Sequence, residues 1–308
     1  MYNPGIKEEF LAGYDGGNRK SARPLFEATG VFESACCKDF AEMTFEEAIS
    51  AIREAKIGSY GTAAAIPGMI KHYVKWCQDS RVFKDVNLDL LKIGVDDIDS
   101  SKYLKEMVFI SEDELIHHLN SVRPYADGYP EVIVMLFAWV GIKQNDVASI
   151  KISDVDIDNR KVYLERRGMY IGFSDKIAEI LRVYEKTKVG SRSAGGDNRD
   201  VFRDDSHDRF VRKYFPKGKS GDAFTSVQIK HIVNHLNYLY VSQGNHPRFT
   251  GSSVLISGAL RRVWELEQSG VDVFSIKNKK AVSEAFLIEA KLYEILWLYR
   301  NYKKAFNL

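Results

Sequence analysis

One stretch decides the fold of this chain: residues 136–150, Leu-Phe-Ala-Trp-Val-Gly-Ile-Lys-Gln-Asn-Asp-Val-Ala-Ser-Ile. Its first residues close the most apolar helix that the sequence predicts, Val132 to Val140. A helix that is apolar all round is expected in a domain core. Gly141 then interrupts the apolar run, and Gln144 and Asn145 are expected at the N-terminus of the next helix.

Upstream of this stretch, residues 5 to about 93 predict short helices joined by irregular links. Thr44 to Glu47 form a capping-box pattern that opens one helix. A second helix carries Pro67, which is expected to kink it or to lie in its first turns. The chain then becomes rich in Asp and Lys and weakly periodic, which places a domain linker at residues 94–107.

A new capping box at Ser111 to Glu114 opens the second domain, residues 108–308. The alternation at Val162 to Leu164, with flanking patterns at 155–157 and 169–173, predicts a small antiparallel sheet. The glycine- and serine-rich residues 189–200 predict a loop. Further helical patterns cover residues 174–184, 226–240, 252–266 and 280–306. The expected fold class is therefore mainly α-helical with a small antiparallel β-sheet, in two domains.

Length and composition agree with a two-domain globular protein and leave its partners open. The chain has 308 residues, of which 45% are hydrophobic and 28% charged. Its net charge is only +2, so any DNA-binding surface requires basic residues segregated onto one face. Cys36, Cys37 and Cys77 include no Cys-x-x-Cys pair, which favours reduced thiols over disulfides or zinc. We expect no signal peptide and no membrane span, and hence a cytoplasmic protein.

The order of these elements, with the residues at their joints, resembles the tyrosine recombinases, the family of phage integrases. Around its first catalytic arginine that family has Gly-Leu-Arg, an acidic residue three positions later, and a Leu before Trp-x-Asp. Gly141, Asp146, Ile150 and Asp154 fit this pattern, but Lys143 stands in the place of the arginine. The resemblance implies a helical core-binding domain at residues 1–93 and a catalytic-like domain at residues 108–308.

A second motif, residues 248–259, resembles the family's Thr-Pro-His-x-Leu-Arg-His-Ser-x-Ala box. In this register Ser252 replaces the histidine and Leu255 replaces the second arginine. An alternative register puts Arg261 on the arginine, but Gly258 then falls on the histidine. The nucleophile position is ambiguous among three C-terminal tyrosines, with Tyr293 nearest the family's spacing. All three lie in a crowded apolar helix, where aromatic side chains usually pack; they are Tyr293, Tyr299 and Tyr302.

These substitutions imply that strand cleavage is lost while DNA binding remains. A lysine is a point charge that does not reproduce the bidentate guanidinium fork, and losing one such clamp typically costs ~2–4 kcal/mol in the transition state. Phosphate contacts in binding need only positive charge and hydrogen-bond donors. The candidate DNA-binding residues are Arg19, Lys20, Arg23, Tyr60, Lys71, Lys75, Lys143, Gln144, Asn145, Arg166, Arg167 and Arg248.

The resemblance therefore implies a sequence-specific repressor similar to the integrase-like repressors that maintain lysogeny in SPbeta-like phages. It implies double-stranded DNA with repeated operator elements as the partner, self-association on DNA, and a bacterial cytoplasm. An active but divergent recombinase using Arg261 and one C-terminal tyrosine stays an alternative, and an accessory partner of a true integrase is a third. We expect no metal and no cofactor: His231 and His235 have a zinc-binding spacing but no evident third ligand.

Overall fold

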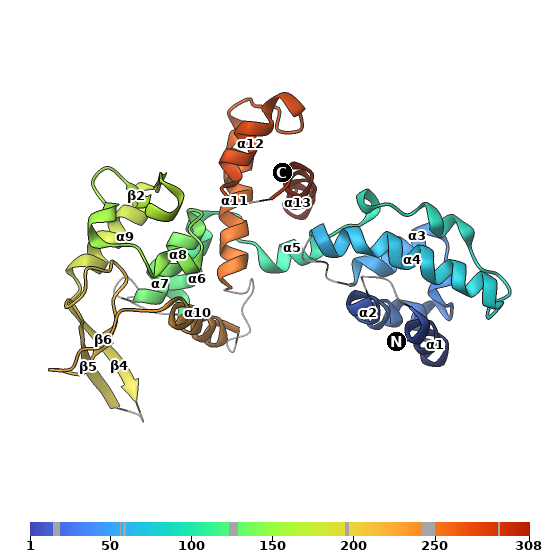
Figure 1. Ribbon diagram of the computed structural model, residues 1–308, viewed down its shortest axis with the longest axis horizontal. Helices are drawn as coiled ribbons and strands as arrows, with labels where there is room; N and C mark the ends of the chain where they lie inside the picture. Colours follow the sequence, from blue (N-terminus) through green and yellow to red (C-terminus); the bar gives the residue numbers. More distant parts are fainter. Residues whose placement is uncertain are drawn as a thin grey trace. The chain divides into compact units, whose positions relative to one another are not determined.

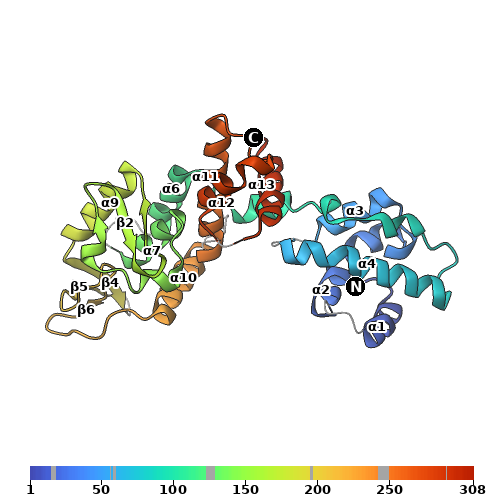
Figure 2. The ribbon, with the colours of Figure 1, turned by 45° about the horizontal axis from the view of Figure 1, so that its top comes forward.

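The computed structural model describes residues 1–14, 19–55, 57, 60–122, 129–194, 197–241, 250–288 and 290–308, without the side chains of 19–21, 191–194, 197–199 and 241. These residues form two compact units (Figures 1 and 2). Unit 1 comprises Met1–Lys105 together with Tyr293–Leu308, and unit 2 comprises Glu106–Leu292. The fold is mainly helical with small antiparallel sheets, as the sequence predicts.

Unit 1 is a bundle of helices around one apolar core. Its elements are α1 (Pro4–Gly13), α2 (Arg19–Cys36), η1 (Phe40–Glu42), α3 (Phe45–Arg53), α4 (Tyr60–Ser80), η2 (Leu88–Lys92), η3 (Val95–Asp97), α5 (Ser101–Met107, which crosses into unit 2) and α13 (Leu292–Phe306). The capping box predicted at Thr44 is present, because its hydroxyl accepts from the Glu47 amide. Pro67 lies inside α4, whose buried residues Tyr73 and Val74 reach the centre of the core.

The division of the chain differs from the predicted boundaries at two places. The expected linker, residues 94–107, buries Ile98 and Leu104 and belongs to unit 1 up to Lys105. Helix α13 also groups with unit 1, although the sequence placed it in the second domain. There Asn301 accepts from the Ser100 amide at 2.9 Å. Such contacts join residues about 200 positions apart, so no local pattern reveals them.

Unit 2 packs its helices and sheets around α7, whose residues are all buried as predicted. Its elements are α6 (Glu112–Val122), α7 (Pro130–Trp139), α8 (Gln144–Val147), η5 (Ile152–Asp154), β1 (Val155–Asp156), β2 (Lys161–Leu164), η6 (Glu165–Arg167), β3 (Met169–Gly172), α9 (Asp175–Lys186), β4 (Val189–Ala194), β5 (Asp197–Arg203), β6 (Tyr214–Phe215), α10 (Ser226–Val241), α11 (Gly251–Gln268), η7 (Ile276–Asn278) and α12 (Lys279–Phe286). Strands β1, β2 and β3 form the predicted antiparallel sheet, in which Val162 pairs with Ile171.

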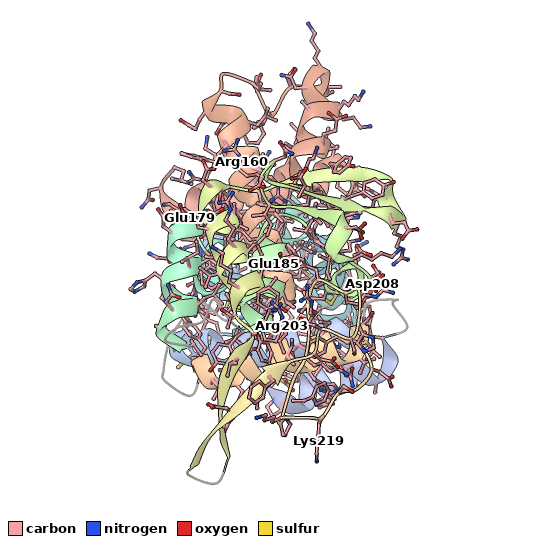
Figure 3. All side chains as sticks on the ribbon, turned by 90° about the vertical axis from the view of Figure 1, so that its left-hand side faces the viewer. Arg160, Glu179, Glu185, Arg203, Asp208 and Lys219 are labelled. Carbon is pink, nitrogen blue, oxygen red and sulfur yellow. The ribbon has the colours of Figure 1, made fainter. Side chains whose placement is uncertain are left out.

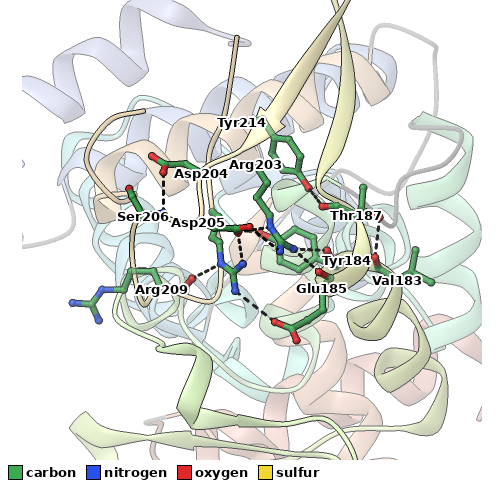
Figure 4. A network of polar contacts seen from close by, with 11 residues as sticks. Val183, Tyr184, Glu185, Thr187, Arg203, Asp204, Asp205, Ser206, Arg209 and Tyr214 are labelled. Atoms are coloured by element: carbon green, nitrogen blue, oxygen red, sulfur yellow. Dashed lines mark hydrogen bonds and ion pairs between the residues drawn. The ribbon is translucent and has the colours of Figure 1, made fainter. Parts of the chain in front are cut away.

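A second antiparallel sheet, β4-β5-β6, corrects the prediction of a loop at residues 189–200. Strands β4 and β5 reach away from the helices as a narrow ribbon (Figure 3). The base of the ribbon is held by buried arginines (Figure 4). Arg203 donates to the carbonyls of Tyr184 and Glu185 and to Asp205, which also accepts from Arg212 at 2.6 Å. These partners lie just outside the glycine-rich residues 189–200, whose own composition disfavours strands.

Candidate nucleic-acid interface

Four of the predicted DNA-binding residues surround one hollow of about 980 Å³ in unit 2: Lys143, Asn145, Arg166 and Arg167. Lys143 comes from the turn between α7 and α8, Asn145 from α8, and the two arginines from the connection between β2 and β3. The end of α12 closes the hollow with Ser283, Glu284 and Leu287. Residues separated by more than 100 positions thus meet at a single surface feature that carries three cationic side chains.

The turn that follows α7 places Lys143 at this hollow. Gly141 has φ +103°, a conformation that favours glycine, and it lets the chain turn sharply after the buried helix. Lys143 then occupies the N-cap position of α8 and is half-buried. The predicted neighbour Gln144 lies elsewhere, because its Nε2 is 2.0 Å from where a Cβ on Gly251 would stand. Gln144 therefore packs against the start of α11 and does not line the hollow.

The two arginines of the β2–β3 connection differ in solvent exposure and in their hydrogen-bond partners. Arg166 has a side chain 79% exposed, and its Nη1 lies 3.5 Å from Oδ1 of the buried Asp146. Arg167 is 21% exposed and approaches Asp146 at 3.4 Å while also donating to the carbonyls of Gly141 and Leu287. One carboxylate faces both guanidinium groups at these long distances. Glu284 adds a second carboxylate to the hollow, where it lies 3.8 Å from Lys280. An anion at the hollow therefore meets Lys143 and two guanidinium groups that Asp146 approaches only at long distances.

The positions that resemble catalytic residues hold side chains of a different character. Leu255 packs against the apolar core of unit 2, whereas Ser252 is exposed in the first turn of α11. Arg261 lines a separate hollow of about 670 Å³, stacks over the Trp264 ring at 4.1 Å and pairs with Glu265 at 2.8 Å. No histidine or tyrosine is among the described residues that line this second hollow.

Tyr293, the tyrosine nearest the family's spacing, belongs to unit 1. Its ring centroid lies 4.9 Å from that of Tyr60, and Tyr60 also meets the ring of Trp297 at 5.8 Å. Tyr293 is 48% exposed, while Tyr299 and Tyr302 are fully buried. Tyr60, predicted to contact DNA, thus takes part in an aromatic cluster within its own unit.

The remaining candidates fall into three groups, and all of them except Arg248 belong to unit 1. Lys71 and Lys75 lie one turn apart on α4, and both are exposed. Arg23 forms a bidentate pair with Glu8, at 2.5 and 2.7 Å, so a DNA contact would have to compete with this carboxylate. Arg19 and Lys20 begin α2, but their side chains lie outside the described residues, as does the whole of Arg248.

Arg262, the residue after Arg261, was not among the site residues predicted from the sequence. Arg262 lines the second hollow and donates to the carbonyls of Trp139, Ala285 and Phe286. Burial lowers its pKa to about 10. The sequence does not distinguish Arg262 from Arg261, because both lie in the same predicted helix.

Two features of the described residues bear on other kinds of site. They contain no group of three or more His, Cys, Asp or Glu side chains arranged to hold a metal ion. His231 and His235 lie on α10 and are both exposed. Within the same part of the chain, no helix combines the length and the apolar character needed to cross a bilayer.

Comparisons with known proteins give one family match and several similar solved structures. Residues 1–79, about a quarter of the chain, match the family model described as MrpR, N-terminal core-binding domain. The chain is similar to the crystal structure of XerA recombinase, at 14% identity and a TM-score of 0.43, over 99% of this chain and 96% of that one. It is also similar to Tn1549 transposon integrase in complex with circular intermediate DNA, at 14% identity and a TM-score of 0.41, over 97% and 95%. The same integrase with transposon right end DNA gives 13% identity and a TM-score of 0.41, over 97% and 95%.

No curated protein matches the chain. The chain combines a helical unit, which contains residues 1–105, with a second unit of helices and small antiparallel sheets. Residues 1–79 of the first unit are similar to the MrpR N-terminal core-binding domain.

Proposed function

We propose that this protein is a sequence-specific repressor that binds double-stranded DNA and maintains phage lysogeny. It uses the recombinase fold to grip DNA and does not cut it. The proposal is carried by one observation: Lys143, Arg166 and Arg167 converge on a single hollow. The position resembling the second catalytic arginine holds Leu255, which is partly buried and packs against the core.

Binding and cleavage make different demands on such a site. Binding gains affinity with each phosphate that a cation neutralises, whatever the geometry of the cation. Cleavage requires guanidinium, imidazole and phenol groups around one phosphate, and Leu255 supplies neither charge nor donor. The match of residues 1–79 to the MrpR core-binding domain supports the repressor of SPbeta-like phages as the nearest functional model. We propose that the protein acts in a bacterial cytoplasm, where it binds repeated operator elements and self-associates on them.

Charge reversal at the hollow tests the interface. We expect Lys143→Glu and Arg166→Glu each to weaken binding to duplexes carrying genomic sites mapped in the native host. Because one phosphate contact is lost, the slope of log K against log salt should fall by about 1. Binding isotherms at several salt concentrations measure both effects. Lys219→Glu is the matched control, since Lys219 lines neither hollow and points outward in Figure 3. Isotherms for both hollow variants that overlay the wild type would show that DNA binds elsewhere.

A suicide-substrate assay distinguishes the repressor from the divergent recombinase. A nicked duplex traps any covalent protein–DNA intermediate, and we expect none at protein concentrations that saturate the DNA. The reason is that phosphoryl transfer without arginine clamps loses many orders of magnitude in rate. An adduct that disappears in Tyr293→Phe would overturn the proposal in favour of an active enzyme.

A further inference from the structure

Arg262 joins the end of α7, the helix that precedes Lys143, to the end of α12, which lines the DNA-binding hollow, although Arg262 does not line this hollow itself. Its Nη1 donates to the carbonyl of Trp139, the last residue of α7, at 2.7 Å. Its Nε donates to the carbonyl of Ala285 at 2.9 Å, and its Nη2 to that of Phe286 at 3.4 Å, both at the end of α12. One guanidinium therefore ties the helix before Lys143 to the helix that forms the opposite wall.

The electrostatics of Arg262 suit this bridging role. No carboxylate lies within ion-pair distance of its guanidinium among the residues that the structure describes. Its acceptors are carbonyls at two helix C-termini, where the helix dipoles place partial negative charge. A planar fork with several fixed donors reaches these carbonyls together, which the single ammonium of a lysine does not.

The turn after α7 is held from a second side by Arg167. Arg167 donates to the carbonyls of Gly141 and Leu287, at 3.4 and 3.3 Å. A Cβ on Gly141 would lie 3.2 Å from Nη2 of Arg262, so Arg262 also contacts this turn directly. The turn that leads to Lys143 thus lies between two arginines.

We propose that Arg262 is a positioning residue for DNA binding, which holds the α7–α8 turn and so places Lys143 at the hollow. This inference rests on the proposed function, because Lys143 has to contact DNA for its placement to matter. Part of the DNA affinity that Lys143 contributes then depends on Arg262, a side chain that does not itself contact the DNA.

A double-mutant cycle tests the coupling. Binding of a cognate duplex is measured for Lys143→Gln, Arg262→Lys and the double variant, with Arg261→Lys as the matched control. Loss of a charge-assisted phosphate contact should weaken binding about tenfold in Lys143→Gln. If Arg262 acts through Lys143, Arg262→Lys should cause a similar loss, and the double variant should bind no more weakly than either single variant. Arg261→Lys should bind as the wild type does, because Arg261 contacts Glu265 and Trp264 instead.

Hydrogen exchange keeps the test decisive if Arg262→Lys also lowers stability. The amides of Gly141 and Ile142 donate to Ala138 and Phe137 within the turn, at 3.0 and 2.9 Å. We expect their exchange to accelerate in Arg262→Lys while core amides such as Ile177 keep their protection. Acceleration spread evenly over unit 2 would mean a global role and overturn the inference.

The cycle also separates the two proposals. An unchanged isotherm for Lys143→Gln would refute the proposed interface. Weaker binding for Lys143→Gln with unchanged binding for Arg262→Lys, or losses that multiply in the double variant, would refute only the positioning role.

Discussion

Replacing Lys7 by methionine is expected to destabilise unit 1 by about 3–5 kcal/mol, because it leaves buried carboxylates without their cation. The Lys7 ammonium lies 2.5–2.6 Å from both oxygens of Glu33 and 3.4 Å from Asp39. All three side chains have no exposed surface. Asp39 also accepts from the Tyr73 hydroxyl at 2.8 Å, so the cluster ties α1 and α2 to α4. Urea unfolding monitored by circular dichroism measures the loss.

The pH dependence of this loss follows from Glu33. Burial raises the pKa of Glu33 above its ordinary value of 4.5. The native state then binds more protons than the unfolded state above pH 4.5, so this group lowers stability as pH rises through that window. Removing the Lys7 ammonium removes a charge that opposes the raised pKa. The variant should therefore lie closer to the wild type at pH 5 than at pH 8. An equal gap at both values would contradict this account.

Arg23→Met is the matched control for Lys7→Met. Arg23 also binds a carboxylate, Glu8, through two short hydrogen bonds. Both side chains are about half exposed, at 51% and 47%, and water replaces the lost contacts. We expect no measurable change in unfolding. A loss comparable with that of Lys7→Met would show that burial is not the cause.

Gly258→Ala is expected to cost about 3 kcal/mol or more, since a Cβ at this position would lie 1.8 Å from the Trp139 carbonyl oxygen. That oxygen is backbone, so α11 and the end of α7 would have to separate. The shift would also strain the Arg262 bond to the same carbonyl. Thermal and urea unfolding measure the effect.

Gly68→Ala provides the opposite expectation at a second helical glycine. Gly68 lies in α4 with no atom within 4 Å of its would-be Cβ. Alanine has the higher helix propensity, so we expect stabilisation of up to about 1 kcal/mol. If Gly258→Ala and Gly68→Ala changed the free energy of unfolding in the same direction and by a similar amount, the close approach of α11 to α7 would not explain the effect of Gly258→Ala.

The elements that the sequence predicts correctly are those whose signals are local. Thr44 and Ser174 cap helices through bonds to amides three residues away, and those bonds are present. The apolar residues of α7 favour burial whatever the helix packs against, and all residues of α7 are buried. The ribbon of β4 and β5 was not predicted, because residues 189–200 are rich in glycine and serine and the bonds at its base come from Arg203, at the end of β5, and from Arg212.

The candidate site shows the same division. The family motif singled out Lys143, and the predicted hairpin singled out Arg166 and Arg167; the structure brings all three to one hollow. Neither spacing nor composition indicates that Gln144 turns to α11, that Arg23 is held by Glu8, or that Tyr60 packs on Tyr293.

The sequence by itself determined the helical class, the position of the first sheet and the residues that depart from the recombinase motifs, because each depends on neighbours within a few positions. Only the tertiary structure decided that α13 returns to unit 1 and that Arg262 bridges α7 and α12. These contacts join residues 23 to about 200 positions apart, and chain folding, not local periodicity, brings such residues together.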